Sequence, residues 1–166
     1  MVMNINSKVL AETLYTEAIQ KKHCDIPPEV NIPPAALPAI EAKIQLYQFT
    51  SVLLALMTTA STKPEFLPVQ EYLERLLFPP TPQEGTDILL DVQGAMRDLS
   101  ELLTTKEEDR AIPSSKAGKS MFWARDWLSR VGVEENNPVT LALFALKWID
   151  YYTTINDSLT DFNPVA

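Results

Sequence analysis

The stretch from Leu37 to Ala60 constrains the fold more than any other part of the chain. In its first half, apolar residues recur at steps of four and three, at Ile40, Ile44 and Tyr47, with polar residues between them. This spacing predicts a helix with one face in the core. The second half contains residues 52–57, VLLALM, which are apolar on every side, and a helix tolerates this only where neighbours cover it. The sequence therefore predicts a helix that starts at the surface and ends at the centre of a bundle.

Five further segments have the spacing of amphipathic helices, and we expect them over residues 8–22, 65–78, 82–104, 115–131 and 138–157. Ser7, Thr81 and Asn137 are expected to cap the first, fourth and sixth helices of the chain, and Ser114 or Ser115 is expected to cap the fifth. No segment alternates with period two, so we expect no sheet, and we expect the tail after Asp157 to fray. The predicted fold class is all-α: one domain over residues 1–166, an antiparallel bundle of about six helices.

Residues 27–38 hold five of the thirteen prolines and separate the first two predicted helices. Proline fixes the backbone and biases the preceding residue towards extended geometry, so this segment is predicted to be a semi-rigid connector. We interpret it as a strap over the surface of the domain. The alternative is an arm that carries the first helix to another protomer.

Charge and cysteine content restrict the possible partners. The formal charge of −8 and the pI near 4.6 argue against nucleic acid and against anionic membranes, and they favour a basic protein partner. The single cysteine, Cys24, excludes an internal disulfide and favours a reducing compartment. No signal peptide is visible, and the longest apolar run is far shorter than the ~18 residues that span a bilayer. We therefore expect a cytoplasmic protein.

Aromatic residues are concentrated towards the C-terminus. All three tryptophans and eight of the fourteen aromatic residues lie between Phe122 and Phe162. Such density is typical of a core, and the alternatives are a pocket for an apolar ligand or a patch that binds another protein. The candidate ligand- or partner-binding residues are Phe122, Trp123, Trp127, Phe144, Trp148 and Tyr151.

A basic segment lies just before these aromatic residues. Residues 110–130 contain five basic residues and one acidic residue, and residues 117–120, AGKS, resemble the end of a phosphate-binding loop. The full loop needs a glycine at position 113, which is Pro113, so a nucleotide loop is excluded. A weak anion site at Lys116, Lys119 and Ser120 remains as one hypothesis. The other is a solvated face that pairs with the protein's own acidic residues.

Acidic residues follow one stripe of the predicted helix 82–104: Asp87, Asp91, Asp98 and Glu101. With Glu71 and Glu74 they resemble the Mg²⁺-binding glutamate pairs of the all-α nucleotide pyrophosphohydrolases, although the pair-then-pair spacing of that family is missing. We expect a solvated acidic face with no metal and no cofactor. His23, Cys24 and Asp25 are consecutive, so their side chains diverge and we assign no catalytic residue.

The absence of a catalytic motif in the sequence and the surplus of acidic residues favour a non-catalytic protein-interaction module, such as an inhibitor, an immunity-type protein or an adaptor. A small-molecule-binding bundle that uses the aromatic helices is the alternative, followed by an Mg²⁺-dependent phosphate-ester hydrolase. We also expect a homodimer with its contact on the aromatic C-terminal helices, because these helices have more large apolar positions than one buried face can hold.

Overall fold

The computed structural model describes residues 2–77, 82–104 and 118–166, and for residues 82–87 it describes the backbone. Two short 3₁₀ helices, η1 (Pro34–Ala36) and η2 (Pro64–Phe66), directly precede the α-helices that begin at Leu37 and Leu67. Within these residues the predicted all-α class with about six helices is confirmed, because they contain six α-helices: α1 (Ser7–Gln20), α2 (Leu37–Thr62), α3 (Leu67–Leu77), α4 (Pro82–Leu103), α6 (Lys119–Arg130) and α7 (Pro138–Leu159).

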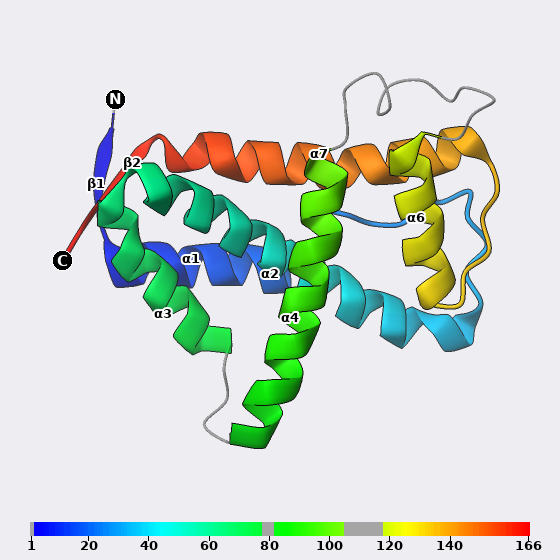
Figure 1. Ribbon diagram of the computed structural model, residues 1–166, viewed down its shortest axis with the longest axis horizontal. Helices are drawn as coiled ribbons and strands as arrows, with labels where there is room; N and C mark the ends of the chain where they lie inside the picture. The colour runs from blue at the N-terminus through cyan, green and yellow to red at the C-terminus, as the bar shows by residue number, and fades with distance from the viewer. Residues whose placement is uncertain (1, 78–81, 105–117) are drawn as a thin grey trace.

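The long helices lie across one another rather than in a single parallel array (Figure 1). α1 runs away from the end of the molecule where both chain termini lie, whereas α2 and α7 run towards it. α4 crosses α2 and α7 at a steep angle, and the short α6 packs on α7 near the opposite end. α1 is therefore antiparallel to α2, while α2 and α7 run in the same direction.

The chain ends form a small parallel strand pair, which we did not predict. β1 (Met3–Asn6) pairs with β2 (Phe162–Val165), with Met3 opposite Phe162 and Asn6 opposite Val165. The Ser7 hydroxyl donates to the Val165 carbonyl at 3.0 Å, which ties the start of α1 to the tail. The expectations of no sheet and of a fraying tail were wrong, because strands of four residues are too short to give a readable alternation.

Capping side chains and a glycine mark several of the helix ends. Asn137 caps α7 as predicted, since its side-chain oxygen accepts from the Val139 and Thr140 amides. Asn6, not Ser7, caps α1, because the helix begins one residue earlier than expected. Gly132, with φ of +78°, ends α6 in the left-handed conformation that glycine adopts most easily. The predicted caps at Thr81 and at Ser114 or Ser115 lie outside the described residues.

α2 is the central helix, and it contributes buried side chains to both hydrophobic clusters of the core. Phe49 and Leu56 are fully buried in one cluster, and Tyr47 is buried in the other. The prediction of burial on every side of residues 52–57 was wrong at Leu54, which is half-buried, and at Met57, which is 41% exposed. One side of α2 therefore faces solvent even in its most apolar stretch.

The proline-rich connector packs on its own domain. Val30 is 5% exposed and belongs to the same core cluster as Tyr47, and Ile32 and Ala36 pack against that cluster. Burial of this kind is what a surface strap requires.

In the described part of the chain, no helix is both long enough and apolar enough to cross a bilayer.

Candidate functional site

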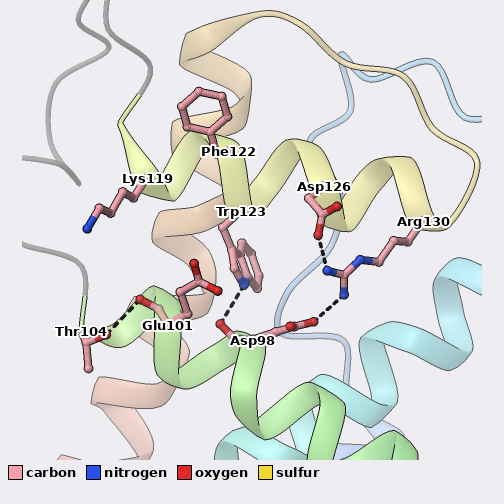
Figure 2. Close-up of a pocket in the computed structure, with 8 residues that line it drawn as sticks. All are labelled: Asp98, Glu101, Thr104, Lys119, Phe122, Trp123, Asp126 and Arg130. Carbon is pink, nitrogen blue, oxygen red and sulfur yellow. Dashed lines mark hydrogen bonds and ion pairs between the residues drawn. The ribbon is translucent and has the colours of Figure 1, made fainter.

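A cleft of about 440 Å³ lies between α4 and α6 (Figure 2). α4 provides residues 98 and 101, which lie on one face of that helix, and residue 104 follows directly after its end. α6 provides residues 119, 122, 123, 126 and 130, which also share one face. The lining residues are Asp98, Glu101, Thr104, Lys119, Phe122, Trp123, Asp126 and Arg130.

A hydrogen-bonded network around the Asp98 carboxylate forms one side of the cleft. Asp98 is 8% exposed, and its Oδ2 accepts from the Tyr47 hydroxyl at 2.5 Å and from Arg130 Nη1 at 2.6 Å. Arg130 also pairs with Asp126, one helical turn earlier in α6. Burial raises the pKa of Tyr47, and the hydrogen bond to Asp98 raises this pKa further. The network links α2, α4 and α6 through one buried carboxylate.

Trp123 forms the wall of the cleft and is held in place by the protein. Its indole N–H donates to the backbone carbonyl of Asp98 at 2.9 Å, and its ring stacks on Phe144 with centroids 6.3 Å apart. Phe122, by contrast, is 55% exposed, and the Arg125 guanidinium lies 5.9 Å from its ring centroid. The cleft therefore offers a fixed aromatic ring beside an exposed one.

The six aromatic residues that the sequence singled out have different surroundings. Trp127, Phe144 and Trp148 are at most 1% exposed and contact one another in the core. Tyr151 is half-buried, with its ring stacked on His23 at 4.9 Å. Phe122 and Trp123 line the cleft. Phe122 and Trp123 can therefore contact a partner in this cleft, whereas Trp127, Phe144 and Trp148 are buried, and Tyr151 lines a separate pocket with His23.

The sequence analysis did not predict that residues of α4 and α6 line one cleft. Asp98 and Glu101 were considered as part of an acidic stripe on α4, and Arg130 as part of a basic segment. For Arg130, pairing with the protein's own acidic residues is confirmed, with Asp98 and Asp126 as its partners. Opposite charges on two predicted amphipathic helices were the signal that could have placed these faces together.

The weak anion site has one residue in the cleft. Lys119 is exposed and lines the cleft, whereas the Ser120 side chain is buried at 1% exposed, and Lys116 lies outside the described residues. Anion binding at this end of α6 stays a prediction.

Two acidic residues of the α4 stripe, Asp91 and Asp98, have different surroundings, and the side chain of Asp87 lies outside the described residues. Asp91 is exposed, whereas the carboxylate of Asp98 already binds a guanidinium and a phenol. Among the residues whose side chains the structure describes, 2–77, 88–104 and 118–166, no three His, Cys, Asp or Glu residues are grouped closely enough to hold a metal ion.

Cys24 and His23 face different surroundings, as their consecutive positions predict. Cys24 is fully buried, and burial raises the pKa of its thiol to about 12. His23 lies at the protein surface, with Nε2 3.6 Å from Glu17 Oε2. A buried thiol with a raised pKa is a poor nucleophile at neutral pH.

Deprotonation of the Cys24 thiol in the unfolded chain should lower the free energy of unfolding at alkaline pH. Because the pKa of the folded thiol is raised, its contribution to stability is complete below the unfolded pKa of about 8.5 and is lost as pH rises towards the folded value. We expect the free energy of unfolding to fall by about 1 kcal/mol per pH unit near pH 9.5. Urea unfolding between pH 8 and 9.5 measures this slope, and Cys24→Ala should flatten it. Equal slopes in wild type and variant would contradict the prediction.

Comparisons with protein-family models, with curated proteins and with solved structures gave no match.

Proposed function

We propose that this chain is a non-catalytic protein-interaction domain, which holds a short segment of its partner in the cleft between α4 and α6. Tryptophan, phenylalanine and arginine are enriched in protein interfaces, and all three residue types line this cleft. The main support for this proposal is the Trp123 side chain, which is partly exposed and is already held in position by the protein without a partner. A fixed ring loses little conformational entropy on binding, so more of its contact energy contributes to affinity.

The charge of the chain supports a protein partner with basic character. A formal charge of −8 attracts basic proteins at long range and repels nucleic acids and anionic membranes. A reduced, buried Cys24 suits a reducing compartment, and we propose the cytoplasm.

A small-molecule-binding domain is the second candidate. The volume of the cleft, about 440 Å³, falls in the range of about 300–1,000 Å³ that is usual for ligand pockets. Its aromatic wall and its charged groups could orient a planar ligand. The lining is more highly charged than that of most such pockets, which favours the protein partner.

Affinity capture with matched variants tests the proposal. Proteins that bind the wild-type chain are identified by mass spectrometry, and the affinity of the main partner is then measured with purified components. Phe122→Glu should weaken binding at least tenfold, since it places a charge in the apolar centre of the interface. Val9→Glu on α1 is the control, because Val9 is 50% exposed and lies on a helix that does not line the cleft. Equal losses for the two variants, or no loss for Phe122→Glu, would exclude the cleft as the binding site.

The proposed partner can also be a second copy of this chain, as the sequence-based expectation of a homodimer requires. Light scattering of the wild type beside Trp123→Glu distinguishes the two arrangements. A wild-type dimer that Trp123→Glu converts to a monomer identifies a second copy as the partner. A wild-type monomer excludes the homodimer and leaves a different protein as the partner.

A further inference from the structure

We infer that the cleft recognises an extended segment with a large apolar side chain placed between an acidic and a basic residue. This inference rests on the proposed function, since it specifies the chemistry of the segment that the partner contributes. It follows from the order of the groups along α6, from the charges at the two ends of the cleft and from its length.

The lining groups of α6 follow one another along the helix axis. Lys119 lies at one end, Phe122 and Trp123 lie in the middle, and Asp126 and Arg130 lie towards the other end (Figure 2). At ~1.5 Å per residue, Lys119 is about 10 Å from Asp126 along the axis and about 16 Å from Arg130.

The two ends of the cleft differ in charge. At the Arg130 end, one guanidinium is shared by two carboxylates, Asp98 and Asp126, so these three groups carry a net charge of −1. Asp126 is 58% exposed and can accept a further hydrogen bond there. The other end is lined by Lys119 of α6 and, closer to Asp98, by Glu101 of α4; Lys119 is exposed and its amino group points away from the labelled carboxylates, Glu101 included. An incoming basic side chain fits the Asp126 end, and an acidic side chain fits the Lys119 end.

The middle of the cleft suits an apolar side chain. The Trp123 ring is fixed by its indole hydrogen bond, and the Phe122 ring is 55% exposed. Arg125 already lies over the Phe122 ring, so a further cation there would meet a like charge. An aliphatic or aromatic side chain would bury both rings without that repulsion.

The length of the cleft along α6 matches that of a short extended segment. In an extended segment, residues i, i+2 and i+4 point to the same side and span about 13 Å. This span lies between the two axial distances from Lys119 to Asp126 and to Arg130. An acidic residue, an apolar residue and a basic residue at these three positions would meet the three parts of the cleft.

Four capped pentapeptides test the inference. They carry leucine at the centre, alanine at the second and fourth positions, and at their two ends Glu and Arg, Arg and Arg, Glu and Glu, or Gln and Gln. Binding is followed by tryptophan fluorescence and by the indole resonance of Trp123, because Trp127 and Trp148 are at most 1% exposed and do not meet the peptide. The peptide with Glu and Arg should bind about three- to tenfold more tightly than each of the others, since it alone has a favourable charge contact at both ends.

Reversal of one charge in the protein should change which peptide is preferred. Lys119→Glu makes both ends of the cleft acidic, so this variant should bind the peptide with two arginines most tightly. Lys8→Glu on α1 is the matched control, because Lys8 is also exposed and lies outside the cleft, and it should keep the wild-type order. Equal affinities for all four peptides, or an unchanged order in Lys119→Glu, would overturn the inference.

The outcomes separate this inference from the proposed function. If Phe122→Glu abolishes binding of the captured partner while the four peptides bind equally or not at all, the proposed function stands and the inferred segment is wrong. If Phe122→Glu leaves the partner bound and the wild type binds none of the peptides, both proposals fail.

Discussion

Replacing Trp148 with alanine should lower the free energy of unfolding by about 3–5 kcal/mol. Trp148 is fully buried, and its ring contacts those of Tyr47, Trp127 and Phe144 at centroid distances of 5.7–6.4 Å. Alanine would remove this contact area and leave a cavity that rings from three different helices can fill only in part. Urea unfolding followed by circular dichroism measures the loss.

The matched control for Trp148→Ala is Phe122→Ala. Both changes delete an aromatic side chain from the C-terminal part of the chain. Because Phe122 is 55% exposed, Phe122→Ala should lower the free energy of unfolding by less than about 1 kcal/mol. Similar losses for the two variants would show that Trp148 is not the centre of the core. In that case Trp148 would be a candidate for contact with a partner.

Asp98→Ala should also be strongly destabilising and should lower the free energy of unfolding by about 3 kcal/mol. The change removes the acceptor of the Tyr47 hydroxyl and one of the two carboxylates that pair with Arg130. The buried hydroxyl of Tyr47 would then lack a partner, whereas Arg130 would keep Asp126. Most of the cost therefore comes from the phenol and from the lost packing between α2 and α4.

Two further variants check the origin of this loss by urea unfolding. Asp91→Ala, an exposed carboxylate on the same helix, should change the free energy of unfolding by less than about 0.5 kcal/mol. Tyr47→Phe removes only the hydroxyl and should cost about 1 kcal/mol. If Asp98→Ala costs no more than Asp91→Ala, the network between α2, α4 and α6 does not stabilise the domain.

Periodic spacing predicted most of the helices because each has one strongly apolar face. α7 is the clearest case: Leu141, Ala145 and Trp148 recur at steps of four and three and are all fully buried. The Asn137 cap and the Gly132 terminator were also predictable, because each acts on the backbone within a few residues of its own position.

The candidate site was harder to predict because it depends on contacts between distant segments. Phe122 and Trp127 have similar chemistry and lie on the same helix, yet one is exposed and the other is buried. The difference arises from where α4 and α7 cover α6, which spacing within α6 cannot show. Asp98 looked like one member of an acidic stripe, and its role became visible only when Tyr47 and Arg130 were placed beside it.

The strand pair joins segments from opposite ends of the sequence. Asn4 and Asn163, 159 positions apart, are joined by a side-chain hydrogen bond across the two strands. Two strands of this length are marginal by themselves, so they can persist only after α1 and α7 have brought the ends together. Slow hydrogen exchange at the Met3 amide, which donates to the Asp161 carbonyl, would therefore report that α1 and α7 are packed in place.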